Sequence, residues 1–242
     1  MTAVLELKDL RKSYGAIIVA DALSYSLEDG EALGVIGPNG AGKTSMFNLI
    51  TGTVQAQSGD VYFKGQPITK LSAAARCRAG IARSFQIPQP FGAMSVFENV
   101  LVAATQGAGE SGHAANELCL DILEQTGLMA RANAPAGGLT LLERKRLELA
   151  RALGARPSLL LLDEIAGGLT EQECQSLIAT INDVRASGVS IIWIEHVVHA
   201  LLAVVDRLIV IDFGRKIAEG QPDEIMASRE VQEIYLGIEA GA

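Results

Sequence analysis

The residues best suited to chemistry form a glycine-rich stretch around position 40. It reads Gly37-Pro-Asn-Gly-Ala-Gly-Lys43-Thr44-Ser45, after an apolar run at 32–36 that predicts a strand and before a helical pattern. Glycines let backbone N–H groups approach phosphate oxygens, and a helix N-terminus adds positive charge. Lys43 suits the β- and γ-phosphates of a nucleotide, and the Thr44 hydroxyl suits Mg²⁺. The stretch therefore predicts a phosphate-binding loop rather than a chance glycine-rich turn.

A second apolar run, at 159–162, ends in two acidic residues, Asp163 and Glu164. Ligands of open α/β sheets bind beyond the carboxyl ends of the strands, where this run would deliver its acids. Asp163 is predicted to hold Mg²⁺ through water. Glu164 is predicted to activate or orient a water aimed at the γ-phosphate. The alternative is a strand that ends at a polar surface.

Two further single residues have both a chemical and a structural interpretation. His196 follows the apolar run 190–194 and could bond the γ-phosphate, or be an ordinary core or surface histidine. Tyr14 stands shortly before the loop and could stack on a nucleotide base. Its alternative is a tyrosine at a strand edge that packs on the core.

The elements that must position these residues can be read from the pattern along the chain. Short strands at 3–7, 17–19 and 23–27 predict a small antiparallel sheet. Residues 87–153 are predicted to be helix and loop only, and buried strands alternate with helices elsewhere, which indicates a parallel α/β sheet. Three helices are predicted to start with capping boxes, in which a hydroxyl side chain and a Glu three residues later each bond the other's backbone N–H. The capping pairs are Ser95 with Glu98, Thr140 with Glu143, and Thr170 with Glu173.

Composition narrows the class of protein. The 242 residues carry a net charge of −8, which argues against a partner bound by phosphate neutralisation, so no nucleic acid is expected. No apolar run approaches the roughly 20 residues of a membrane span, and no secretory signal opens the chain, so a cytoplasmic protein is expected. The three cysteines fit neither a zinc site nor a disulfide framework and are expected to be small, buried or half-buried apolar residues. They are Cys77, Cys119 and Cys174.

Taken together and in this order, these motifs resemble the ATP-binding-cassette (ABC) ATPases over nearly the whole chain. The matching positions are Tyr14, residues 37–44, Gln86, Asp163-Glu164 and His196. The resemblance implies an α/β P-loop NTPase fold of the ABC ATPase type, with a parallel-sheet core, an N-terminal antiparallel β subdomain and an inserted helical lobe. It implies domains at 1–86 (ATP-binding core), 87–153 (helical signature subdomain) and 154–242 (core continued, with a C-terminal helical tail).

The same resemblance implies an ATPase that uses ATP and Mg²⁺ and assigns roles to single residues. Glu164, His196 and Gln86 would be catalytic, and Thr44, Gln86 and Asp163 would hold Mg²⁺, partly through water. The nucleotide would be bound by Tyr14, Gly37, Pro38, Asn39, Gly40, Ala41, Gly42, Lys43, Thr44 and Ser45, and in trans by Thr140 of a second cassette. Two such domains would dimerise head to tail around ATP.

Within the family, several segments are similar to the ATPase subunits of branched-chain amino acid importers. They are residues 81–88, 95–101, 144–153, 194–196, 214–220 and 235–237. The partners implied are ATP, membrane permease subunits and a second ABC ATPase, with the chain peripheral on the inner face of the cell membrane. Importers of urea, short amides or aromatic acids share the pattern, and no residue here touches the solute.

The chain departs from the family at the signature, Leu-Ser-Gly-Gly-Gln, whose place falls at 139–143. Thr140 keeps a hydroxyl, but Leu141 and Leu142 replace glycines and should crowd the approach to phosphate. Glu143 replaces glutamine, and its favoured role is in the capping box; Gly137-Gly138 lies four residues too early for the family spacing. A complete phosphate-loop side and a weak signature side predict a heterodimer rather than a homodimer.

Three other functions remain as alternatives. A soluble ABC-type protein without a transport role would usually carry two cassettes, coiled-coil arms or a basic surface, which this chain lacks. A regulatory subunit with weak hydrolysis is suggested only by the signature, and the presence of Glu164 and His196 argues against it. A generic P-loop kinase would leave Gln86 and His196 without a role.

Overall fold

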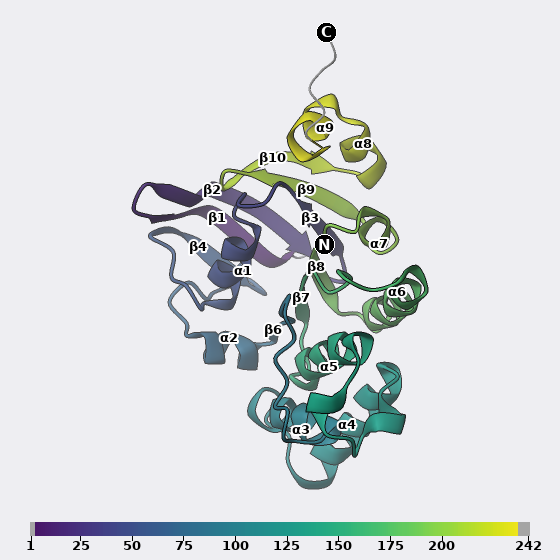
Figure 1. Ribbon diagram of the computed structural model, residues 1–242. Coiled ribbons are helices and arrows are strands. Elements are labelled where there is room, and N and C mark those ends of the chain that lie inside the picture. The colour runs from purple at the N-terminus through teal and green to yellow at the C-terminus, as the bar shows by residue number, and fades with distance from the viewer. Residues whose placement is uncertain (1–2, 237–242) are drawn as a thin grey trace. The chain divides into compact units, whose positions relative to one another are not determined.

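The computed structural model describes residues 3–236 and the side chains of residues 3–233. The chain forms two compact units, residues 1–73 with 190–242, and residues 74–189 (Figure 1). The end of the tail resemblance, Gly237, lies outside the described residues. No helix in the described part of the chain is long and apolar enough to cross a membrane.

The first unit contains the antiparallel sheet that the sequence predicts. Its strand order is β2-β1-β4-β5, with β1 Ala3–Tyr14, β2 Ile17–Glu28, β4 Ser58–Phe63 and β5 Gln66–Pro67. The two short strands expected at 17–19 and 23–27 are one continuous strand. β-Bulges between β1 and β2 absorb the irregular middle, where Asp9 and Ala22 both adopt positive φ (47° and 52°).

The same unit holds a set of strands that carry the phosphate loop. β3 (Ala32–Ile36) pairs in parallel with β8 (Ser190–Ile194) and with β9 (Arg207–Asp212), and β10 (Arg215–Gly220) pairs antiparallel to β9. β3 and β8 are buried at every position, as expected for parallel strands covered on both faces. The helices of this unit are α1 Lys43–Thr51, α7 Val198–Leu202, α8 Pro222–Ala227 and α9 Arg229–Leu236.

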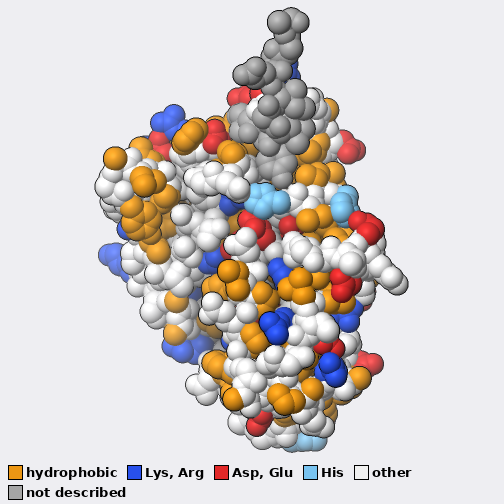
Figure 2. Space-filling view, in the orientation of Figure 1, with side chains coloured by type: hydrophobic (Ala, Val, Ile, Leu, Met, Phe, Trp, Pro, Cys, Tyr) orange, Lys and Arg blue, Asp and Glu red, His pale blue; other side chains and the backbone are white. Residues whose placement is uncertain are grey.

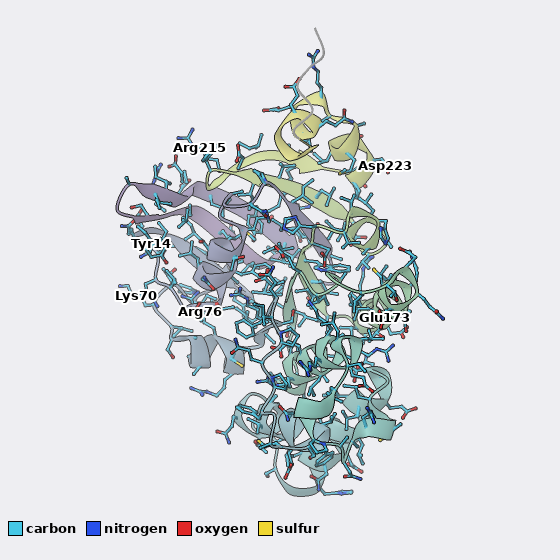
Figure 3. The ribbon with its side chains drawn as sticks, in the orientation of Figure 1. Tyr14, Lys70, Arg76, Glu173, Arg215 and Asp223 are labelled. Atoms are coloured by element: carbon cyan, nitrogen blue, oxygen red, sulfur yellow. The ribbon has the colours of Figure 1, made fainter. Side chains whose placement is uncertain are left out.

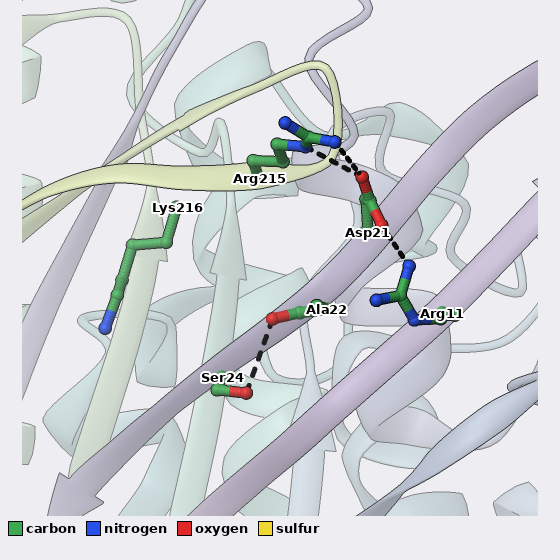
Figure 4. Close-up of a pocket in the computed structure, with 6 residues that line it drawn as sticks. All are labelled: Arg11, Asp21, Ala22, Ser24, Arg215 and Lys216. Carbon is green, nitrogen blue, oxygen red and sulfur yellow. Dashed lines mark hydrogen bonds and ion pairs between the residues drawn. The ribbon is translucent and has the colours of Figure 1, made fainter.

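Ion pairs between charged side chains link the start of β10 to β2. These side chains line a shallow pocket of about 450 Å³ (Figure 4). Asp21 pairs with Arg11 on one side and accepts a 2.7 Å hydrogen bond from Arg215 Nε on the other. These bonds, that from Arg215 foremost, hold the pKa of Asp21 below its usual value. Lys216, which also lines the pocket, pairs with Glu219. The ion pairs of Asp21 with Arg11 and Arg215 therefore link β10 to β1 and β2 beside this pocket.

The second unit is mostly helical. β6 (Ile81–Arg83) pairs in parallel with β7 (Leu159–Asp163), and β6 is shorter than the strand expected at 81–85. The predicted helical content of 87–153 is confirmed, and α3, α4 and α5 lie together in one lobe (Figure 1). The helices are α2 Ala73–Ala79, α3 Val96–Gln106, α4 Gly112–Gln125, α5 Leu141–Gly154 and α6 Glu171–Ala186, with 3₁₀ turns at Met129–Arg131 and Ala136–Gly138.

The structure of the second unit agrees with the local signals in its sequence. All three predicted capping boxes form, at the starts of α3, α5 and α6. On the face shown in Figure 2, apolar side chains of the lobe lie interspersed with charged ones. The cysteines also behave as predicted, since Cys119 and Cys174 are buried and Cys77 is half-buried.

Candidate functional site

The phosphate loop of the first unit joins β3 to α1 and needs glycine at two positions for steric reasons. Gly37 has φ +152°, and a Cβ there would lie 2.0 Å from the carbonyl oxygen of Ile211. Gly42 has φ +103°, and a Cβ there would lie 2.4 Å from the carbonyl oxygen of Val19. An L side chain at either position would displace neighbouring backbone, so both glycines are required before any ligand is considered.

Lys43 is folded back over this loop. Its side chain is buried, and Nζ donates to the carbonyl oxygens of Gly37 (2.7 Å) and Pro38 (2.9 Å). The backbone N–H of Gly214 donates to Ala41 O at 2.8 Å, which ties the loop to the β9–β10 turn. The ammonium group and the loop around it therefore have a defined arrangement, which reduces the cost of ordering them on binding.

The start of α1 is open in a way that suits an anion. Gly42 is the N-cap, and no side chain caps the helix. The first N–H groups of a helix have no partner within the helix, and together with the helix dipole they favour a bound phosphate. Thr44 is exposed and Ser45 half-buried in this first turn, and their roles in binding nucleotide and Mg²⁺ remain predictions.

The two single residues assigned to the first unit lie at the ends of strands. Tyr14 ends β1 and is 51% exposed, with Lys12 Nζ 5.1 Å from the centroid of its ring (Figure 3). His196 follows β8 and is exposed, and its backbone N–H donates to Glu195 Oε1 at 2.9 Å. Buried Glu195 thus fixes the backbone that carries His196. Base stacking by Tyr14 and phosphate bonding by His196 remain predictions.

In the second unit the two acids at the end of β7 have different surroundings. Asp163 is buried and forms a 2.6 Å ion pair with Arg83 Nη2, and both side chains are at most 7% exposed. Glu164 is half-buried and accepts a hydrogen bond from the Gln86 side-chain amide. Glu164 also has φ +48°, a conformation that a non-glycine residue rarely adopts. The structure therefore brings the side chains of Gln86 and Glu164 together, and their catalytic roles remain predictions.

Two basic residues of this second unit were missed by the sequence argument. Arg83 neutralises Asp163, and buried Lys145 donates from Nζ to the carbonyl oxygens of both Gln86 and Glu164, each at 3.1 Å. A signal for Lys145 existed, because it stands four and seven residues before the buried Leu149 and Ala152 and so shares their helix face. Nothing local in the sequence distinguishes Arg83 from a surface arginine.

The signature segment is a capped helix start. Thr140 Oγ1 accepts from the N–H of Glu143, and Glu143 Oε2 accepts from the N–H of Thr140 at 2.8 Å. Arg131 Nε also donates to Glu143 at 2.8 Å; the bond from Thr140 and the pairing with Arg131 hold the pKa of Glu143 below its usual value. The predicted capping role of Glu143 is confirmed.

The neighbouring glycines are not available as a substitute signature. The N–H of Gly137 donates to Gly92 O at 3.0 Å, and Arg144 Nη2 donates to Gly137 O at 3.2 Å. Leu141 is 46% exposed and Leu142 half-buried, so α5 presents leucine side chains at its start.

The residues predicted to hold a metal fit Mg²⁺ in their chemistry. A threonine hydroxyl, a glutamine amide oxygen and an aspartate carboxylate are hard oxygen donors, which Mg²⁺ prefers along with water and phosphate. The described residues contain no cluster of three or more His, Cys, Asp or Glu side chains, which excludes a site built from such groups alone in that part of the chain. A nucleotide-supported Mg²⁺ needs only one or two carboxylates.

Comparison with known proteins identifies the family of this chain. Residues 20–167 match the family described as ABC transporter, and residues 215–241 match one described as branched-chain amino acid ATP-binding cassette transporter. The chain is 33% identical to the high-affinity branched-chain amino acid transport ATP-binding protein BraF of Pseudomonas aeruginosa, over 97% of this chain and 98% of BraF. It is 34% identical to a Nod factor export ATP-binding protein of Cupriavidus metallidurans, over 97% and 78% of the two chains.

The fold is also that of solved cassettes. A crystal structure of an ATP-binding cassette of an ABC transporter in its ADP conformation matches with a TM-score of 0.87 at 30% identity, covering 98% of this chain and all of that one. The predicted α/β fold of the ABC ATPase type is thereby confirmed. The family match, the relatives and the fold agree, and the chain belongs to the ABC transporter family as one of its nucleotide-binding ATPase subunits.

Proposed function

We propose that this chain powers the import of branched-chain amino acids as an ATPase subunit peripheral on the inner face of the cell membrane. The observation that carries the solute class is the match of residues 215–241 to the branched-chain amino acid cassette family, with BraF as a relative that aligns over nearly the full length of both chains. The permease subunits would supply the solute path, because the described helices of this chain include no membrane span.

In this proposal, each group acts on ATP according to its chemistry. Lys43 and the N–H groups at the start of α1 bind the β- and γ-phosphates, and Tyr14 stacks on the base. Thr44, Gln86 and Asp163 hold Mg²⁺, which neutralises charge on the phosphates when it is bound. Glu164 takes the proton from the attacking water or orients that water, and His196 bonds the γ-phosphate. The Gln86–Glu164 hydrogen bond supports the pairing of two of these roles.

We further propose that the working ATPase is a heterodimer. The capping box occupies Thr140 and Glu143, and Leu141 stands exposed beside them, so this signature is poorly suited to cover a partner's ATP. The phosphate loop of this chain would be covered by the intact signature of a second ABC ATPase and would turn over ATP there. The opposite site, closed by residues 139–143, would turn over slowly or serve a structural role.

The heterodimer is tested with the variant Glu164→Gln, which is expected to trap bound ATP. The mass of this variant in solution is measured with and without MgATP. A monomer that still binds ATP supports the heterodimer. A doubling of mass with ATP would contradict it and make a homodimer the working unit.

The solute is tested separately, in cells that lack this chain. Loss of labelled leucine, isoleucine and valine uptake, restored by the wild-type chain but not by Lys43→Met, supports the proposal. Retained uptake of all three, with loss of urea or amide uptake, would reassign the solute. If the chain does not co-purify with a membrane permease, a non-transport ABC ATPase becomes the better interpretation.

A further inference from the structure

Lys145 is a buried cation of the second unit that contacts both the segment at Gln86 and the segment at Glu164. Lys145 lies near the start of α5, 4% exposed, and its Nζ donates to the carbonyl oxygens of Gln86 and Glu164, each at 3.1 Å. Burying an ammonium group is costly unless hydrogen bonds replace its water, and these two carbonyls do so. The buried site of Lys145 is therefore stabilised by its hydrogen bonds to both backbone segments.

The two carbonyls belong to residues whose side chains also meet. Gln86 Nε2 donates to a carboxylate oxygen of Glu164, so the pair is joined through its side chains and through the ammonium group. Glu164 holds φ +48°, a conformation that is unfavourable for a non-glycine residue and persists only where the surroundings enforce it. The bond from Lys145 to the carbonyl of Glu164 is one of the contacts made by this strained residue.

We propose that Lys145 is a positioning residue that sets the distance and orientation of Glu164 relative to Gln86. This inference rests on the roles of Gln86 and Glu164 in ATP hydrolysis given above. Lys145 acts through their backbones and does not touch the nucleotide. Because α5 begins at the Thr140 capping box, one rigid helix joins the signature segment to the group that holds both catalytic residues.

A second cation of the same helix provides a matched comparison. Arg151 Nη1 donates to the carbonyl oxygen of Gln89 at 2.9 Å, pairs with Glu148 at 3.1 Å, and stacks 5.0 Å from the centroid of Phe91. It therefore holds the segment after Gln86. Within the described residues, no hydrogen bond or ion pair links it to Glu164. Arg151→Met thus releases one segment, and Lys145→Met releases two.

The first test is hydrogen–deuterium exchange on the intact chain, which needs no turnover. Lys145→Met is expected to speed amide exchange about tenfold in residues 84–88 and in residues 163–167, because both lose a hydrogen-bond anchor. Arg151→Met is expected to speed exchange only around residues 87–91. Equal exchange at 163–167 in wild type and Lys145→Met would overturn the proposal, as would the same pattern in both variants.

The second test is steady-state ATP hydrolysis by the chain in its assembled complex. Lys145→Met is expected to lower kcat about 10- to 100-fold, as misplacement of a catalytic group by about 1 Å does, with KM for ATP unchanged. Lys145→Arg, which keeps the charge, is expected to have a kcat between those of wild type and Lys145→Met. Lys145→Gln, which keeps N–H donors, serves if the methionine variant does not fold. A rise in KM at constant kcat, or an unchanged kcat, would overturn a positioning role.

Failure of the proposed function would look different. Glu164→Gln should abolish turnover, so in that background the exchange measurement, and not the rate, reports the effect of Lys145→Met. If Glu164→Gln turns over like wild type, the catalytic assignment fails, whereas the exchange result still decides what Lys145 holds.

Discussion

The starts of α1 and α5 are built in opposite ways although the family gives both a role beside a phosphate. At α1 the N-cap is Gly42, no side chain caps the helix, and Lys43 lies over the loop. At α5 the capping box of Thr140 and Glu143 satisfies two backbone N–H groups from within the chain. One helix start keeps its donors for a ligand, and the other uses them for its own stability.

This difference shows what a phosphate site requires beyond a helix N-terminus. Every α-helix has four N–H groups without intrahelical partners at its start. Whether they bind a ligand depends on what else can reach them, and at α5 a carboxylate already does. A negative Glu143 near a phosphate would also repel it. The comparison therefore predicts large effects from changes at the start of α1 and small ones from changes to the capping box of α5.

The largest expected effect comes from removing the cation at α1. Lys43→Met should lower ATP hydrolysis at least about 10²- to 10³-fold, the usual loss when one group that stabilises transition-state charge is removed. The measurement is kcat and KM with MgATP, together with thermal unfolding to verify folding. Lys70→Met, an exposed lysine of the same unit, is the control and should be unchanged. Wild-type turnover in Lys43→Met would show that the open helix start does not work on ATP.

The features that the sequence predicted are those set by neighbours along the chain. The strand–loop–helix around Gly37 and Gly42 was predictable, because glycine spacing and apolar runs are local signals. The capping box at Thr140 was predictable for the same reason, and it correctly gave Glu143 a structural role. The strand at 17–28 was split in the prediction, because its bulges depend on pairing with β1.

Contacts between distant residues could not be predicted in the same way. Arg83 pairs with Asp163 across 80 positions, and Lys145 reaches Gln86 across 59 and Glu164 across 19. Each depends on which residues of the β6–β7 pair and of α5 become neighbours after folding. A charged residue on the buried face of a helix indicates that the residue is paired in the folded protein, but the sequence does not identify its partner.

The second prediction converts α5 towards the family pattern. Leu141→Gly with Leu142→Gly and Glu143→Gln, placed in Glu164→Gln, should tighten ATP-dependent self-association about tenfold, or 1.4 kcal/mol. Glycine permits close backbone approach to phosphate, and the neutral amide removes a repulsion. Analytical ultracentrifugation with MgATP measures the dimer fraction. Since two glycines weaken a helix by about 1 kcal/mol each, the folded fraction must be verified first. An unchanged dimer fraction in folded protein would mean that these residues do not limit association.

The third prediction removes the hydroxyl that caps α5. Thr140→Ala should cost about 1 kcal/mol of unfolding free energy, measured by urea titration. Thr170→Ala removes the same capping box from α6 and is the matched control. If Thr140 serves only as a cap, the two variants lose similar stability and both keep ATPase activity. A selective loss of activity in Thr140→Ala would show that its hydroxyl also acts on ATP, against the contrast drawn between α1 and α5.

The smallest effect is a pH dependence of stability at the same capping box. The pKa of Glu143 is lowered on folding, first by the bond from the Thr140 N–H and then by Arg131, so its ionised form stabilises the folded state. That contribution is complete above the unfolded pKa, near 4.3, and is lost as the pH falls through the lower folded value. Glu143→Gln should therefore be less stable than wild type at pH 7 by about 0.5 kcal/mol, and this gap should narrow as the pH falls below the unfolded pKa and close below the folded pKa. Urea titrations at pH 7 and at acidic pH measure this difference in unfolding free energy.

The Glu98 and Glu173 carboxylates have pKa values lowered by their own capping boxes, so Glu173→Gln should show the same convergence with wild type at acidic pH. A gap that stays constant with pH would mean that the carboxylate charge contributes nothing at α5, and that glutamine at this position costs stability through packing alone.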